Sequence, residues 1–257
     1  MELTRDKQSY LLDCLLEMGD LMLDAGAEIS RVEDTLARIG KAYGALRTDV
    51  FVIPSIISIS VEFAEGESLT ETRRIHSNGL TDFYRLEKLN TLSRSCCADP
   101  LPPEVLREAL DKVAAGRKPF RVILGGSVLA GFSFAVFFGG SVGDGLVAAV
   151  FAVAVVMLQE YLGRTELNTV TFNLASSLLI GLGVGFAAAL IPALHMDKIL
   201  IGDIMLLIPG LAMTNAIRNM LVGDTISGVV RLAESLIWAA ALAGGIMVAL
   251  LIVGALF

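Results

Sequence analysis

The polar side chains best placed to do chemistry lie in residues 208–224, directly after a run of mostly apolar residues. Pro209 has no backbone N–H, and its ring crowds the carbonyl of Met205, so a helix that runs through Pro209 and Gly210 is bent or broken. In hydrocarbon, the backbone groups that such a break frees survive only inside protein or beside a water-filled cavity. We therefore predict that this segment handles a polar solute.

Three polar residues beyond the break fall on one helical face. Asn215, Arg218 and Asn219 are three and four positions apart, so the two amides and the guanidinium share that face. A guanidinium suits a carboxylate, which it can bind through two parallel hydrogen bonds. The three residues are therefore predicted to bind substrate. The simpler alternative is a kinked helix whose polar end merely leaves the membrane.

Two acidic residues flank this polar face. Asp203 lies before Pro209, where it is predicted to face the interior, to contribute to substrate binding, and either to bind a proton or to pair with Arg218. Asp224 follows the polar face. An ionisable group within a membrane span is a functional-site hypothesis, because burying it costs several kcal/mol. Asp203 and Asp224 are therefore the residues predicted to couple substrate movement to an ion.

The distribution of charged residues divides the chain in two. Most of its Lys, Arg, Asp and Glu residues precede Phe120, whereas apolar runs of about 20 residues, long enough to cross a bilayer, begin at Val122. We predict a cytoplasmic α+β domain over residues 1–118, followed by an all-α transmembrane bundle of about five helices over residues 119–257. The net charge of −7 argues against nucleic acid as a partner.

Two periodicities organise the first domain. Leucines at helical spacing predict a helix over residues 4–26, and Ser30 with Glu33 predicts a capping box that starts a second helix. Alternation over residues 57–63 predicts a strand with one buried face, and residues 69–76 are expected to return antiparallel to it. The domain is therefore expected to contain a short sheet as well as helices.

The first domain contains polar candidates but no catalytic constellation. They include Glu28, Arg31 and Glu33, together with a histidine, His76, that has neither metal-ligand spacing nor a nucleophile motif beside it. The three cysteines of the chain lack zinc and Cys-x-x-Cys spacing and are predicted to be reduced, structural thiols. We therefore expect no enzymatic activity, no cofactor and no metal.

Apolar runs predict five membrane spans with short turns between them. The spans are expected at residues 121–139, 145–162, 170–192, 199–217 and 232–257. Cytoplasmic loops carry an excess of Lys and Arg. The basic residues that fall inside when the first domain is cytoplasmic are Arg117, Lys118, Arg121, Arg164, Arg218 and Arg231. The N-terminus is therefore predicted in the cytoplasm and the C-terminus outside, with no signal peptide before the first helix.

The odd number of spans bears on assembly. It excludes an internally duplicated transporter within this chain alone. We therefore predict a small multispan partner subunit, a homo-oligomer, or both.

Several stretches of the chain resemble one family of membrane exporters. They are residues 23–33, 85–94, 131–134 and 138–140, then Ile208-Pro209-Gly210, Thr214-Asn215-Ala216-Ile217-Arg218 and residues 223–228. On their order along the chain, it resembles the threonine/serine exporter family. The resemblance is closest to the short form, in which a cytoplasmic domain and five spans pair with a separate small membrane subunit, as in paired proteins proposed to export succinate. The family pattern commonly has an acid after the arginine, where this chain has Asn219, which puts coupling through that position in doubt.

The resemblance implies a secondary transporter subunit of the bacterial inner membrane that exports small polar carboxylate metabolites, driven by the proton gradient. Threonine, serine and a dicarboxylate such as succinate all fit, and the sequence leaves open the substrate, the coupling ion and the subunit stoichiometry. The alternative is a membrane-tethered enzyme or ligand sensor whose N-terminal domain carries the activity. Anchoring such a protein needs one span rather than five, so export is the favoured interpretation.

The distribution of Lys and Arg generates a test of orientation. A reporter that works only outside the cytoplasm should be active when fused after Phe257 and inactive when fused before Met1. A reporter that works only in the cytoplasm should give the reverse pattern, which controls for expression. The opposite result at either end would overturn the span count or the orientation.

Overall fold

The computed structural model describes residues 4–64, 68–75, 81–116, 119–162 and 168–256. The chain divides into two compact units, the first formed by Met1–Arg117 with Leu211–Leu232 and the second by Lys118–Gly210 with Ala233–Phe257. Four residues used in the predictions above lie outside the described residues: His76, Arg117, Lys118 and Arg164.

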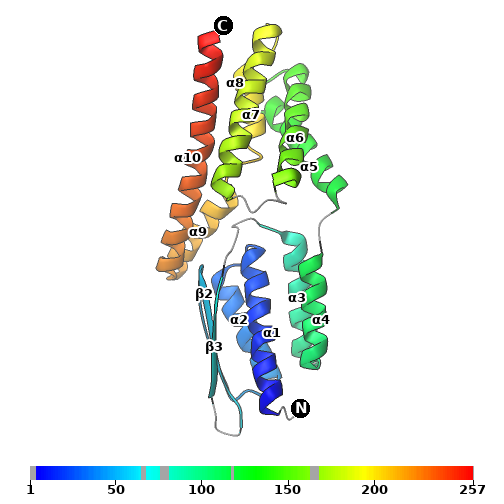
Figure 1. Cartoon of the computed structure of the whole chain (residues 1–257), viewed down its shortest axis with the longest axis vertical. Helices are drawn as coiled ribbons and strands as arrows, with labels where there is room; N and C mark the ends of the chain where they lie inside the picture. The colour runs from blue at the N-terminus through cyan, green and yellow to red at the C-terminus, as the bar shows by residue number, and fades with distance from the viewer. Residues whose placement is uncertain (1–3, 65–67, 76–80, 117–118, 163–167, 257) are drawn as a thin grey trace. The chain divides into compact units, whose positions relative to one another are not determined.

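The first unit combines helices with a small sheet (Figure 1). In chain order its N-terminal part contains α1 (Arg5–Asp24), α2 (Ile29–Ala42), β1 (Arg47–Ile53), β2 (Ile56–Glu62), β3 (Ser68–Arg74), α3 (Phe83–Ala98) and α4 (Pro103–Ala115). Nearly all of α9 (Gly210–Val222) and the first residues of α10 (Thr225–Leu256) also belong to this unit. The prediction of an α+β fold for the N-terminal part is confirmed.

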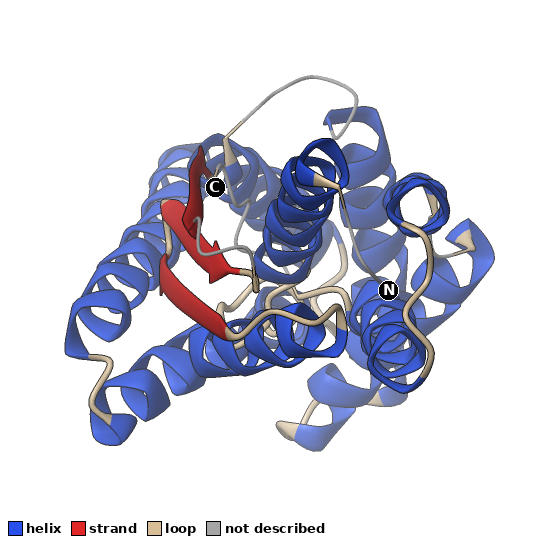
Figure 2. Cartoon of the chain, turned by 90° about the horizontal axis from the view of Figure 1, so that it is seen from below, coloured by secondary structure: helices blue, strands red, loops and turns tan. Residues whose placement is uncertain are grey.

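An antiparallel sheet in the order β1-β2-β3 packs one face against α1 and α2. Figure 2 shows the strands side by side. On β2, Ile57 and Ile59 are buried in the core with residues of both helices, whereas Ser58 points to the other face and shares a hydrogen bond with Thr72 of β3 at 3.0 Å. The predicted strand with one buried face and its antiparallel return are therefore confirmed.

The start of α2 differs from the prediction. Gly26 has a positive φ of 84°, which lets the chain turn sharply after α1, and Glu28 becomes the N-cap residue of α2. Ser30 then lies within the first turn, and Glu33 instead accepts a hydrogen bond from the N–H of Val52 in β1 at 3.1 Å. The predicted Ser30–Glu33 capping box is wrong, because Glu33 joins α2 to the sheet.

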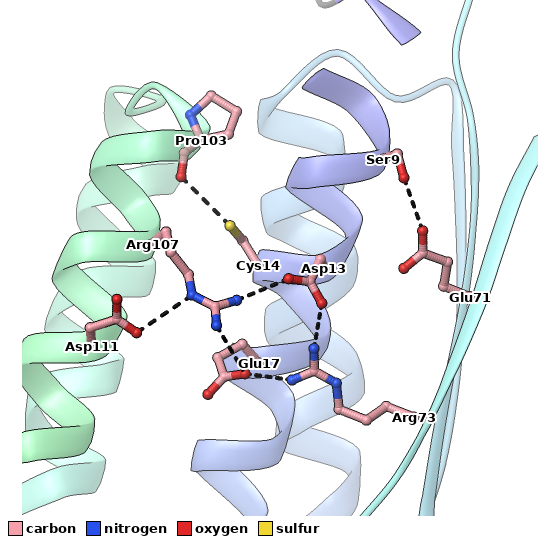
Figure 3. Close-up of polar contacts among 9 residues, drawn as sticks. All are labelled: Ser9, Asp13, Cys14, Glu17, Glu71, Arg73, Pro103, Arg107 and Asp111. Carbon is pink, nitrogen blue, oxygen red and sulfur yellow. Dashed lines mark hydrogen bonds and ion pairs between the residues drawn. The ribbon is translucent and has the colours of Figure 1, made fainter. Parts of the chain in front are cut away.

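A cluster of alternating charges joins α1 to β3 and α4 (Figure 3). Arg73 of β3 donates to both acids of α1, Asp13 and Glu17, and lies 2.5 Å from the Glu17 carboxylate. Arg107 of α4 donates to Asp13 at 2.9 Å. The four side chains are between 23% and 41% exposed, so water and salt screen them less than a surface pair. The cluster therefore holds α1 between the sheet and α4.

The second unit is helical and contains the most apolar part of the chain. It contains α5 (Phe120–Phe137), α6 (Val142–Leu162), α7 (Thr169–Leu190), α8 (Met196–Ile204) and the later part of α10. Among the described residues, four helices are long and apolar enough to cross a membrane: α5, α6, α7 and α10.

The run predicted as the fourth span, residues 199–217, is not one helix. It contains most of α8, which has 9 residues, and part of α9, which has 13. At 1.5 Å per residue, neither helix covers a hydrocarbon core of about 30 Å. In the described part of the chain there are thus four membrane-length helices rather than five, and α10 begins at Thr225 instead of residue 232. Hydropathy misses the interruption because the intervening residues are apolar as well.

The charge cluster predicts that removing a half-buried ion pair lowers the free energy of unfolding more than removing an exposed pair. Arg73→Met leaves two half-buried acids short of a partner, so it should destabilise the first unit by about 1.5–3 kcal/mol, the range for hydrogen bonds to charged groups. Arg38→Met removes an exposed pair with Asp34 within α2 and should cost less than about 0.5 kcal/mol. The protection of backbone amides in α1 and β3 against hydrogen exchange measures the stability of both variants. Equal protection in the two variants would contradict a stabilising role for the cluster.

Candidate functional site

The chain leaves helical geometry between Ile204 and Gly210, the segment that contains Pro209. The N–H of Leu207 bonds the carbonyl of Ile204 at 2.8 Å. The N–H of Gly210 bonds the carbonyl of Ile208, also at 2.8 Å. These short turns replace the helical hydrogen bonds that Pro209 cannot support. The interruption separates α8, in the second unit, from α9, in the first.

The three polar residues predicted to share one face of α9 have three different environments. The Arg218 side chain is 59% exposed, and its guanidinium donates to Glu28 at the start of α2 at 2.5 Å. Asn215 lines a cavity in the first unit. Asn219 is buried, and its side-chain nitrogen has no hydrogen-bond partner among the described residues. The three side chains therefore do not converge on one ligand position.

The cavity beside Asn215 has a volume of about 630 Å³. Residues of α1, α2, α3 and α9 contribute to its lining, together with the loop between α1 and α2. Its charged groups are two acids and two arginines: Glu28, Glu87, Arg31 and Arg94. Within the described structure, neither arginine side chain makes a hydrogen bond or an ion pair. Both guanidinium groups are thus available to an anionic ligand.

Helical spacing explains why α3 forms one wall of the cavity. Phe83, Glu87, Asn90 and Arg94 are three and four residues apart, so they share one face, and all four line the cavity. The Asp82 side chain caps α3 by accepting hydrogen bonds from the first turn. This wall is therefore a well-terminated helix rather than a loop.

The turn between α1 and α2 is fixed against the start of α3. Asp24 pairs with Arg85 at 2.8 Å, and the two side chains are 28% and 20% exposed. The N–H of Asp82 bonds the carbonyl of Ala25 at 3.0 Å. Because both contacts join this turn to the start of α3, Glu28 is held in a defined position relative to α3.

Asp203 lies in the second unit, apart from the polar residues of α9. It is fully buried, and neither carboxylate oxygen has a hydrogen-bond partner among the described residues. Gly131 of α5 lies beside it, since a Cβ on this glycine would be 3.5 Å from an Asp203 oxygen. The pairing of Asp203 with Arg218, one of the two predicted possibilities, would join the two units and stays a prediction; within the first unit, Arg218 binds Glu28.

Asp224 lies in the first unit, between α9 and α10. One of its carboxylate oxygens is buried without a hydrogen-bond partner in the described residues. Burial raises the pKa of the Glu33 carboxyl, the hydrogen bond from Val52 lowers it, and the charge of Asp224 raises it again. The net effect is a raised pKa of Glu33, with burial as its largest cause.

Sequence reasoning singles out Glu28, Arg31 and Asn215 but does not connect them. Glu87 and Arg94 carry no motif, and only their helical spacing along α3 could have indicated a shared face. The cavity brings together three of the stretches on which the family resemblance rests, residues 23–33, 85–94 and 214–218.

The described residues show no metal site. No three His, Cys, Asp or Glu side chains of this part of the chain gather as a metal ion requires. The three cysteines are free. The cavity therefore offers hydrogen bonds and charges rather than metal coordination.

Four membrane-length helices make this chain a multi-pass membrane protein. A family model described as "Putative threonine/serine exporter" matches residues 13–253. The chain belongs to this family, which confirms the resemblance to threonine/serine exporters; the resemblance to their short form stays a prediction.

Two curated relatives carry the same family description. The chain is 24% identical over 244 residues to the "Threonine/serine exporter" of Corynebacterium glutamicum, covering 92% of this chain and 50% of that protein. It is 24% identical over 249 residues to the "Probable threonine/serine exporter" of Mycobacterium tuberculosis (strain ATCC 25618 / H37Rv), covering 93% and 46%. The chain thus spans about half the length of the curated relatives it matches. No solved structure matches it.

The interrupted segment generates a test of its role. Pro209→Ala combined with Gly210→Ala should extend helix across the break, since Pro and Gly disfavour a helix interior by roughly 3 and 1 kcal/mol. We expect the double variant to accumulate in membranes as well as the parent but to lose solute efflux. Normal efflux would show that the break is only a packing feature. Pro192→Ala, outside the interrupted segment, is the matched proline control.

Proposed function

We propose that this chain is a subunit of a secondary transporter that exports small polar carboxylate metabolites across the bacterial inner membrane. The observation that carries this proposal is the interrupted segment between α8 and α9, in an exporter-family chain with four membrane-length helices. Such an interruption leaves backbone groups to interact with a solute or with water, which an ordinary spanning helix does not.

The proposed solute carries a carboxylate. Arg218 is the cation of α9, the helix that follows the interrupted segment, and a guanidinium binds a carboxylate through two parallel hydrogen bonds. Threonine, serine and succinate all satisfy this requirement. The names of the two relatives favour threonine and serine.

The proposed coupling ion is the proton, with Asp203 as its binding group. An ionised carboxylate that is buried without partners costs several kcal/mol, so a group in this position favours taking up a proton. Asp224 is the second candidate because one of its oxygens is also buried without a described partner. A proton taken up on one side of the membrane and released on the other would supply the driving force.

The proposed assembly includes a second membrane chain. The two relatives are about twice as long as the region that matches, which leaves room for a small multispan partner, for self-association, or for both. The proposed orientation, with the N-terminus in the cytoplasm and the C-terminus outside, requires α8 and α9 together to complete a fifth crossing. The first unit then meets solutes on the cytoplasmic side.

A ligand sensor tethered to the membrane is the second candidate function, because the cavity of the first unit is large enough for a small molecule. Four membrane-length helices exceed what an anchor needs. Export therefore explains more of the chain.

Efflux from vesicles tests the proposal. Vesicles that contain this chain with a small family partner should export labelled threonine, serine or succinate when a proton gradient is imposed, whereas the chain alone should be inactive unless it self-associates. Failure of all three solutes in both preparations, together with ligand binding by the full chain, would favour the sensor.

Asp203→Asn provides the test of coupling within the same assay. The substitution should reduce gradient-driven accumulation at least tenfold. It should retain exchange of labelled for unlabelled solute, because exchange requires no net proton movement. Asp197→Asn, an exposed acid near the start of α8, is the matched control and should leave both activities unchanged. Gradient-driven export by Asp203→Asn at the parental rate would contradict proton coupling at this residue.

A further inference from the structure

The ion pair between Glu28 and Arg218 lies at the wall of the cavity, with only one partner among the lining residues. Glu28 lines the cavity and its side chain is 19% exposed, whereas Arg218 is 59% exposed and does not line it. Glu28 is the N-cap residue of α2, but its side chain makes no capping hydrogen bond. Its carboxylate can therefore bind a cation that enters the cavity.

A guanidinium lies one helical turn from this carboxylate. Arg31 follows Glu28, the N-cap residue of α2, by three residues and lies in the first turn of that helix. It lines the same cavity, and its side chain makes no hydrogen bond or ion pair with any described residue. An acid and a guanidinium this close match the ammonium and carboxylate groups of an α-amino acid, which are joined through a single carbon.

The opposite walls supply further polar groups. Arg94 and Thr91 of α3, and Asn215 of α9, also line the cavity. They offer a second guanidinium and hydrogen-bonding groups for a small polar side chain. The cavity volume of about 630 Å³ falls in the range of about 300–1,000 Å³ that is typical of small-molecule sites.

We propose that this cavity binds the zwitterion of a small α-amino acid, with its carboxylate on Arg31 and its ammonium on Glu28 in place of Arg218. The choice of solute rests on the proposed export function. A dicarboxylate could place its two carboxylates on Arg31 and Arg94. It is disfavoured because it offers Glu28 no cation and brings a second negative charge into a cavity that contains Glu28 and Glu87, and like charges in one site repel. The cavity thus discriminates between the two solute classes that Arg218 alone does not separate.

The exchange of cations on Glu28 has a consequence for α9. Arg218 links α9 to the start of α2, and α9 begins directly after the break at Pro209. When an ammonium group takes Glu28, the exposed guanidinium returns to water and this link is lost. Because the ligand and Arg218 compete for one carboxylate, binding shifts α9 toward its released state by the difference in their affinities. The released Arg218 can then meet the carboxylate of a solute during export.

Calorimetric titration of the full chain in detergent tests the site with three probes. L-threonine is expected to bind, whereas N-acetyl-L-threonine and succinate, which lack an ammonium group, should bind at least tenfold more weakly. Equal binding of N-acetyl-L-threonine, tighter binding of succinate, or no binding of L-threonine would each overturn the proposal.

Substitutions in the ion pair should act in opposite directions. Glu28→Gln should weaken L-threonine binding at least tenfold. Arg218→Gln should strengthen binding several-fold because it removes the competing cation, while it slows export in vesicles. A purely structural ion pair would give effects of the same sign. Arg38→Gln, which removes the exposed pair with Asp34 in α2, is the matched control and should change neither quantity.

A further variant covers the case in which Glu28→Gln does not fold. Arg31→Gln removes a side chain without a described partner, so it should fold as the parent does and still weaken L-threonine binding at least tenfold. Thermal unfolding checks each variant. Parental affinity in Arg31→Gln would overturn the assignment of the carboxylate.

The site and the export function can fail separately. If vesicles export L-threonine while Glu28→Gln and Arg31→Gln bind it as the parent does, the cavity is not the amino-acid site and the export function stands. If the binding pattern is as expected but no vesicle preparation exports a solute, the cavity is a ligand site and the export function is wrong.

Discussion

Backbone hydrogen bonding is the constraint on which the interrupted segment depends. Pro209 has no backbone N–H to donate, so α8 ends before it and α9 begins after it. Hydrogen bonds in short turns satisfy part of the backbone between the two helices. In hydrocarbon, the backbone groups freed by such an interruption are unsatisfied and raise the free energy of the fold, unless protein or water surrounds them. The result is two short helices in place of one long span, and α9 belongs to the unit that contains the sheet.

Charge pairing is the second level of organisation. In the first unit, the acids of α1 join β3 to α4, and Asp24 with Arg85 joins the end of α1 to α3. The ion pair between Glu28 and Arg218 likewise joins the start of α2 to α9. Most of these acids and bases have defined partners, so the unpaired arginines at the cavity differ from their surroundings. Asp203 differs in the opposite sense, as a buried acid without a described partner.

The two kinds of unpaired group suit the two requirements of the proposed function, a coupled exporter that must recognise a solute and respond to an ion. Arginines at an open cavity can bind an anionic group with little loss of solvation free energy, because water solvates them until the solute replaces it. A buried acid changes its charge only with a large change in free energy, which makes it sensitive to proton supply. The chain places these properties in different units, so recognition and coupling need not use the same residues.

The sequence by itself determined what depends on neighbours along the chain. Alternation over residues 57–63 determined a strand, and Pro209 determined a break. The long apolar runs predicted five spans, four of which are helices of membrane length, whereas the remaining one, over residues 199–217, is divided between α8 and α9. Only the tertiary structure decided the start of α2, where Glu33 bonds β1, and the cavity, where Glu28 meets Arg218 from 190 residues away. Periodicity reports which residues share a face of one element. It contains no information about which face of another element lies opposite, because that is set by the packing of the whole unit.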